Sequence, residues 1–197
     1  MAARRPPRLR APGRRRLGGV LQRVPGRPAA RPGDHRRGEP VTPPVLGGTR
    51  RAVGADDRAA CFQVRKDVFV GEQNVPEGIE YDAHDATAVH VLAVAADGSA
   101  LGTARLLHGP DAAGRTGGDL TVGSLGRLAV TREARGLGVG AALVRAVEDE
   151  ARALGLTGVD LHAQTHALGF YERLGYVVYG PEFPDAGMPH RAMRRTF

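Results

Sequence analysis

The chain has 197 residues, enough for one domain with a sizeable core, and its 28 basic residues are unevenly distributed. Residues 1–50 hold 13 arginines against Asp34 and Glu39, whereas residues 51–197 hold 15 basic and 19 acidic residues. No stretch approaches the roughly 20 apolar residues of a membrane span, and the single cysteine, Cys61, excludes an internal disulfide. We therefore expect a cytoplasmic protein without a membrane segment.

Residues 1–48 are dominated by arginine, proline and glycine, which predicts a disordered tail. A basic arm can bind nucleic acid by neutralising phosphates, but this one lacks the interleaved aromatic side chains that stack on bases. A flexible appendage, or a start codon assigned too far upstream, explains the composition more simply. We expect the ordered domain to span residues 49–197.

The first elements predicted in this domain are a helix and a β-hairpin. Asp56 or Asp57 can cap a helix over residues 58–70. Strands over 88–96 and 100–107 are joined at an Asp-Gly turn. The first half of the domain is therefore expected to be antiparallel.

The second half of the domain predicts a strand–helix–strand crossover. On its long helix, which Gly155 ends, Leu143 and Val147 lie on the expected buried face and Arg145 and Glu148 on the expected solvent face. The other segments are a glycine-rich loop over 108–119, strands over 124–130 and 158–164, a short helix over 167–174, and strands over 176–180 and 190–197. This order predicts a mixed α/β fold.

The most informative stretch is TREARGLGVGAALV, residues 131–144, where Gly136, Gly138 and Gly140 directly precede the long helix. Backbone N–H groups at the start of a helix have no partner within the helix, and the helix dipole reinforces them as an anion site. Arg135 adds a formal positive charge. The expected guest is a phosphate or a pyrophosphate.

A dinucleotide-binding loop is the main alternative, because Gly136, Gly138 and Ala141 fit its fingerprint and Asp160 follows 24 residues after Gly136. Five residues, however, separate the preceding strand from the first glycine. Asp160 lies in mid-strand, and no second strand–helix–strand unit completes a nucleotide domain. These three points count against it.

The stretch RLAV…REARGLGVGAALV, followed by FYERLGY, resembles the GCN5-related N-acetyltransferase (GNAT) superfamily, whose signature is represented by Arg135, Gly138 and Gly140. Further motifs, including VRKDVFVGEQNVP, LHAQTHALGFYERLGY and GMPHRAM, look like its ElaA-type branch. The likeness covers Val64 to Met193. It implies a central, mostly antiparallel mixed sheet flanked by helices, with acetyl-CoA in a V-shaped splay between two central strands.

The resemblance also implies the cofactor site and the reaction. The pyrophosphate of acetyl-CoA would lie on the loop amides, the pantetheine would pair with a strand, and an amine would attack the thioester directly while a backbone N–H polarises the carbonyl. The implied cofactor-binding residues are Leu128, Ala129, Val130, Arg135, Gly136, Leu137, Gly138, Val139, Gly140 and Ala141.

Two catalytic residues are assigned on the same resemblance. Tyr171 is expected to protonate the departing thiolate, although Phe170 and Tyr171 could simply pack the last helix. Glu72 is the candidate general base, with a solvated loop charge as its alternative. His162 and Gln164 share a strand face that could reach the acceptor cleft, and His190 lies in a family motif near it; a hydrogen-bonded core histidine is the alternative for His162.

The segment after the first helix is rich in acids that could attract a cationic amine, namely Glu72, Glu77, Glu80, Asp82 and Asp85. Glu80, Asp82, His84 and Asp85 could also serve as metal ligands, but they lack a dedicated metal spacing. We therefore expect solvated or structurally paired acids and no metal. The sequence thus predicts an N-acetyltransferase that uses acetyl-CoA and acts on an amine of a small molecule or a peptide. A non-catalytic CoA-binding module and nucleic-acid binding through the tail stay as alternatives, and the oligomeric state is not predicted.

Overall fold

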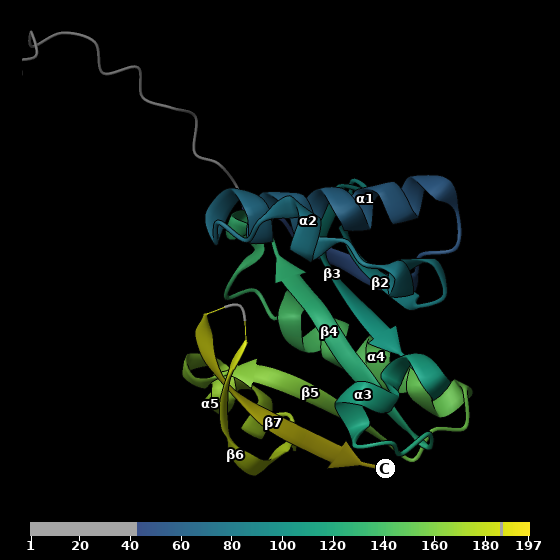
Figure 1. Cartoon of the computed structure of the whole chain (residues 1–197). Coiled ribbons are helices and arrows are strands. Elements are labelled where there is room, and N and C mark those ends of the chain that lie inside the picture. The colour runs from purple at the N-terminus through teal and green to yellow at the C-terminus, as the bar shows by residue number, and fades with distance from the viewer. Residues whose placement is uncertain (1–42, 186) are drawn as a thin grey trace, which may run out of the picture. The chain divides into compact units, whose positions relative to one another are not determined.

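The computed structural model describes residues 43–185 and 187–197, which form a seven-stranded sheet with the order β1-β2-β3-β4-β5-β7-β6 (Figure 1). Neighbouring strands are antiparallel except β4 and β5, which are parallel. The mixed, mostly antiparallel sheet is therefore confirmed. The strands are β1 (Leu46–Arg51), β2 (Val89–Ala95), β3 (Ala100–Leu107), β4 (Val122–Val130), β5 (Gly158–Gln164), β6 (Val177–Asp185) and β7 (Met188–Thr196).

Helices cover both faces of this sheet (Figure 1). They are α1 (Ala55–Arg65), α2 (Glu77–Glu80), α3 (Ala113–Thr116), α4 (Val139–Ala153) and α5 (Leu168–Glu172), with a π-helical segment at Lys66–Glu72 and 3₁₀ turns at Ala83–Ala86, Gly109–Ala112, Arg132–Ala134 and Thr165–Ala167. Side-chain alternation along β2 separates the two layers, because Leu92 packs with Cys61 of α1 while Val91 and Ala93 join the core under α4. None of the helices in the described ranges has the length and apolar character needed to cross a membrane.

Strands β4 and β5 pair only over their first halves, from Val122 opposite Gly158 to Leu125 opposite Leu161. Beyond this point β4 contains a bulge, since three residues of β3 (Thr103 to Arg105) face four of β4 (Gly126 to Ala129). Arg127 lies in the bulge with a positive φ of 53°. A bulge bends its strand and ends regular pairing, so the two strands diverge into a V.

The start of the domain differs from the prediction. Strand β1 was not predicted, and its first three residues fall in the segment 1–48 that composition assigned to the tail; the expected disorder of residues 1–42 lies outside the described residues. Gly54 occupies the N-cap of α1, and Asp56 and Asp57 lie within its first turn rather than capping it. Acidic side chains there still favour the helix through its dipole.

Two further predictions were wrong in the second half. The loop over 108–119 contains α3 and a 3₁₀ turn, because Ala112 and Thr116 are buried against the sheet. Glu148, expected on the solvent face of α4, is only 2% exposed and accepts hydrogen bonds of 2.9 and 2.7 Å from Nη1 of Arg195 on β7. A partner from a distant strand cannot be read from helical periodicity.

Candidate active site

The V between β4 and β5 opens into a cleft of about 1020 Å³. Its walls come from the second half of β4, from β5, from the start of α4, from α5, and from the segment that follows α1. Every predicted site residue lines it except Leu137, whose side chain is exposed. The predicted residues that line it are Glu72, Leu128, Ala129, Val130, Arg135, Gly136, Gly138, Val139, Gly140, Ala141, His162, Gln164, Tyr171 and His190.

The glycine loop presents unpaired backbone donors to this cleft. The first hydrogen bond at the start of α4 runs from the Ala142 N–H to the Gly138 carbonyl at 3.0 Å, so the N–H groups just before Ala142 have no helical acceptor. No side chain caps this terminus, and its first turn contains no acid. Gly136 and Gly138 have φ values of 80° and 81°, which favour glycine and turn the chain into this geometry. The helix start therefore fits an external anion.

Gly140 differs from these two glycines. A Cβ at this position would lie 3.4 Å from Cζ of Phe170, which is an ordinary van der Waals contact. Gly140 thus lies where α5 packs against the start of α4, and the neighbouring Tyr171 lines the cleft. Backbone conformation favours glycine at positions 136 and 138 and not at position 140.

Arg135 already has an anionic partner in the structure. Its Nη2 donates to Oε2 of Glu72 at 2.8 Å, and its Nε donates to the Val130 carbonyl at 3.2 Å. Nη2 of Arg132 lies 3.7 Å from the same Glu72 oxygen. Glu72, predicted as the general base, is therefore an ion-pair partner of the loop arginine. This position makes it a competitor of a bound phosphate.

Tyr171 both packs a helix and lines the cleft. Its ring contacts Phe170 and Tyr176 edge-on, with centroid distances of 4.9 and 6.0 Å. Only 9% of the residue is exposed, and burial raises the pKa of its hydroxyl to about 12. At neutral pH the hydroxyl is protonated and can donate a hydrogen bond into the cleft.

Imidazoles and an amide lie on one face of β5 and β7. Register places Gln164 opposite His190, and His162 on the same face of β5 as Gln164. His162 contacts Phe183 edge-on at 4.8 Å, and Phe183 stacks on His190 at 6.2 Å. Burial, followed by the positive charge of Arg115, lowers the pKa of His162, so this imidazole is neutral at pH 7.

A buried ion-pair network ties the acid-rich segment to the sheet. Arg65, fully buried, donates to Glu80 at 2.5 Å and to Asp85 at 2.7 Å. Arg105 donates to Asp82 and to Asp85, each at 2.7 Å. These three acids are structurally paired, as the sequence predicted for the segment.

Arg127 connects this network to the β4 bulge. Its Nε donates to the Glu80 carbonyl at 3.1 Å, and its Nη2 donates to the Ile79 carbonyl and to Asp82, each at 3.2 Å. The contacts hold a non-glycine residue in a left-handed conformation that ordinarily costs about 1–3 kcal/mol. They also fix α2 as one wall of the cleft.

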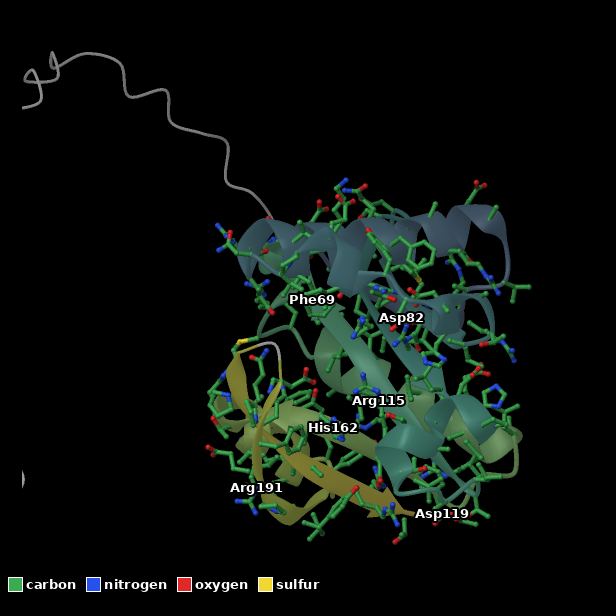
Figure 2. The ribbon with its side chains drawn as sticks, viewed as in Figure 1. Phe69, Asp82, Arg115, Asp119, His162 and Arg191 are labelled. Atoms are coloured by element: carbon green, nitrogen blue, oxygen red, sulfur yellow. The ribbon has the colours of Figure 1, made fainter. Side chains whose placement is uncertain are left out.

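Sequence reasoning missed Arg115 and Arg127, both of which line the cleft. Arg115 is labelled in Figure 2. Arg127 stands in the quoted RLAV motif, but its role depends on a bulge that periodicity does not reveal. Arg115 lies in a segment expected to be an irregular loop. No sequence signal separated it from the other arginines.

Sequence and structure comparisons identify similar proteins. The model of the acetyltransferase (GNAT) family matches residues 58–176. The N-acetyltransferase YjcF of Bacillus subtilis is 38% identical over 135 residues, covering 68% of this chain and 89% of YjcF. The crystal structure of an acyl-CoA N-acyltransferase from Pseudomonas aeruginosa has 31% sequence identity to this chain and a TM-score of 0.63. The crystal structure of Escherichia coli ElaA has 26% sequence identity and a TM-score of 0.64. Each covers 77% of this chain and 99% of the solved one.

Proposed function

Because the chain belongs to the acetyltransferase (GNAT) family and is an acyl-CoA-dependent N-acyltransferase, we propose that it transfers the acetyl group of acetyl-CoA to an amine of a small molecule or a peptide. The observation that carries the proposal is the uncapped, glycine-rich start of α4, which opens into the same cleft as Tyr171 and the divergent edge of β4. The cytoplasmic location stays a prediction.

Residues on two elements would hold the cosubstrate. The N–H groups of Gly136 and of Gly138 to Ala141 would bind the pyrophosphate, where the helix dipole supplements their hydrogen bonds. The Leu137 N–H donates to the Ala134 carbonyl at 3.4 Å. Leu128 to Val130 would bind the pantetheine, because β4 has no strand partner on its β5 side beyond Leu125 among the described residues. An unpaired strand edge offers amides and carbonyls to an extended ligand.

Acetyl-CoA supplies a thioester, whose carbon–sulfur bond breaks as a carbon–nitrogen bond forms. A backbone N–H on β4 would stabilise negative charge on the carbonyl oxygen. Tyr171, with a pKa of about 12, would donate a hydrogen bond to the departing sulfur. Transfer of its proton to a thiolate of pKa about 8.5 is unfavourable, so stabilisation of the thiolate is the better-supported role.

The proton of the attacking amine needs an acceptor in the cleft. Glu72 is bonded to Arg135, and this contact favours anchoring over proton abstraction. His162 is neutral at pH 7 and lies on the face of β5 that also carries Gln164. We assign proton acceptance to His162 in preference to Glu72.

Thiol release from acetyl-CoA against a panel of amines, polyamines, aminoglycosides and peptides tests the proposal, together with calorimetric titration of CoA into the full chain. We expect CoA binding and acceptor-dependent thiol release. Binding without release from any acceptor would favour a non-catalytic CoA-binding module. Absence of both would overturn the proposed function.

A further inference from the structure

Three arginines line the cleft, and they differ in how their charge is neutralised. Arg135 is bonded to Glu72, and Arg127 lies 3.2 Å from carboxylate oxygens of both Glu80 and Asp82. Within residues 43–185 and 187–197, the guanidinium of Arg115 has no ion-pair or hydrogen-bond partner. Arg115 is therefore the cleft arginine whose five donors are available to a ligand.

The acids nearest to Arg115 in sequence are committed to other groups. Asp111 accepts from the Thr87 hydroxyl at 2.6 Å and lies 3.2 Å from His84. Asp119 accepts from the Thr121 backbone and hydroxyl at 2.9 and 2.7 Å. Neither carboxylate neutralises Arg115.

The helix that carries Arg115 is fixed to the sheet. Thr116 is buried, and its hydroxyl donates to the Asp119 carbonyl at 2.8 Å. Nη2 of Arg194 donates to the Thr116 carbonyl at 3.4 Å and to Asp160 on β5 at 2.7 Å. The backbone of α3 therefore holds the base of the Arg115 side chain in place.

Arg115 approaches the cleft from the face of the sheet opposite to α4. Arg194 connects α3 to Asp160 on β5. The neighbours of Asp160 in this strand, Val159 and Leu161, join the core under α4. Because side chains alternate along a strand, Asp160 points to the opposite face of the sheet, where α3 lies. Figure 1 likewise shows α3 in front of the sheet and α4 behind it. The pyrophosphate loop at the start of α4 is thus on the other side, and Arg115 is not part of it.

Arg115 lies next to the proposed proton acceptor. Figure 2 shows Arg115 and His162 close together where β4 and β5 diverge, and both line the cleft. Among charged side chains, Arg115 has the largest effect on the pKa of His162. Asp185 of β6 also lines the cleft and acts on His162 in the opposite sense.

We infer that Arg115 binds an oxyanion of the acceptor, so that the acetylated molecule is a small amine that also carries a carboxylate or a phosphate. This inference rests on the proposed function. The guanidinium matches both groups in bidentate geometry, and Asp185 supplies a complementary charge for the incoming ammonium. A polyamine or an aminoglycoside would instead bring positive charge to Arg115.

Matched acceptor pairs test the inference with the full chain. The pairs are β-alanine with β-alaninamide, and phosphoethanolamine with ethanolamine; spermidine is a polycationic reference. Thiol release gives kcat/KM, and calorimetry with CoA-loaded protein gives binding in the absence of turnover. We expect at least one oxyanion-bearing member to exceed its neutral partner by tenfold or more, and the two pairs distinguish carboxylate from phosphate.

Variants then assign this preference to Arg115. Arg115→Gln should reduce the kcat/KM preference for the oxyanion-bearing acceptor at least tenfold, mainly by raising KM for that acceptor. Arg115→Lys should restore part of the preference, because the positive charge returns without the bidentate geometry. The matched control is Arg145→Gln, since Arg145 is exposed on α4 and does not line the cleft. We expect the control to keep the wild-type preference.

Three results would overturn the inference. Neutral or polycationic amines could be used or bound as well as the oxyanion-bearing ones, or no oxyanion-bearing member could bind at all. The third is a preference for oxyanion-bearing amines that survives in Arg115→Gln. Failure of the proposed function is distinguishable. In that case acetyl-CoA is not consumed with any acceptor, while an oxyanion-bearing amine still binds in calorimetry and loses affinity in Arg115→Gln.

Discussion

Tyr171 packs against its neighbours and also lines the cleft, where we propose that it acts on the leaving sulfur. Its ring fills the space between Phe170 and Tyr176, while its position on α5 makes it a wall of the cleft. The two alternatives considered for this residue are therefore compatible. Burial keeps the hydroxyl protonated, which suits a donor to the leaving sulfur.

We predict that Tyr171→Phe lowers kcat about 100-fold or more, since it removes the donor to the sulfur and keeps the ring. Calorimetry should give an unchanged CoA affinity. Because the pKa of Tyr171 is about 12, its deprotonation should cause no loss of wild-type rate between pH 7 and pH 10. Tyr81→Phe, outside the cleft, is the control, and wild-type turnover in Tyr171→Phe would refute the assignment.

Glu72 allows a prediction in which its two roles give opposite results. If it restrains Arg135, Glu72→Gln should tighten acetyl-CoA binding about two- to fivefold, the range expected from a partly exposed ion pair, with kcat little changed. The gain should shrink at high salt, because ions screen exposed charges. Glu77→Gln removes the exposed pair with Lys66 and serves as control. A large fall in kcat at constant affinity would instead support the general-base role.

Among the elements, the glycine loop and α4 form one unit whose backbone we propose to bind the cosubstrate. Gly138 is the N-cap residue of α4 and adopts a left-handed conformation, which costs a residue with a Cβ about 1–2 kcal/mol. The same conformation directs the N–H groups at the helix start toward the cleft. We therefore expect Gly138 to affect both stability and the proposed cofactor binding.

We predict that Gly138→Ala destabilises the protein by about 1–2 kcal/mol in urea unfolding and raises the KM for acetyl-CoA. Gly54→Ala is the matched control, because Gly54 also occupies an N-cap but has a φ of −79° and open space around its Cβ position. An unchanged KM in Gly138→Ala would show that the loop conformation does not determine cofactor binding.

At the scale of the whole described domain, the arginine–carboxylate network connects α1, α2, β3 and β4. Burial alone would raise the pKa of Asp85, but hydrogen bonds from Arg65 and Arg105 outweigh it and hold this pKa well below 3.8. A carboxyl whose pKa is lowered in the folded state stabilises that state above its unfolded pKa. This contribution is lost as the pH falls toward the folded pKa.

We therefore predict that wild-type stability falls steeply below about pH 4, the region in which an unfolded Asp takes up its proton. Asp85→Asn should cost about 3 kcal/mol at pH 7, because it leaves buried guanidinium groups short of a partner. In urea unfolding, the difference in unfolding free energy between Asp85→Asn and wild type should narrow as the pH falls from 5 to 2. Glu182→Gln, on the exposed surface of β6, should change neither the unfolding free energy at pH 7 nor its dependence on pH. A difference in unfolding free energy that stays constant with pH would show that the ion pairs of Asp85 do not cause the pH dependence of stability.

Features of this protein that depend on local patterns could be predicted from the amino-acid sequence. Alternation and turn residues gave β2, β3 and β5, because strand faces and tight turns are encoded within a few residues. The glycine spacing before α4 predicted an uncapped helix start, since backbone conformation and helix start are both local properties. The family motifs carried the mixed sheet and the class of reaction.

Features that depend on residues far apart in the chain emerge only when the chain is folded. The pairing of Glu148 with Arg195, and of Glu72 with Arg135, joins elements that local periodicity treats separately. The bulge at Arg127 opens the cleft, and the anchoring of α3 brings Arg115 to it. Charge pairing and cleft shape arise from long-range contacts, so Arg115, which we propose to bind the acceptor, could be identified only in the folded chain.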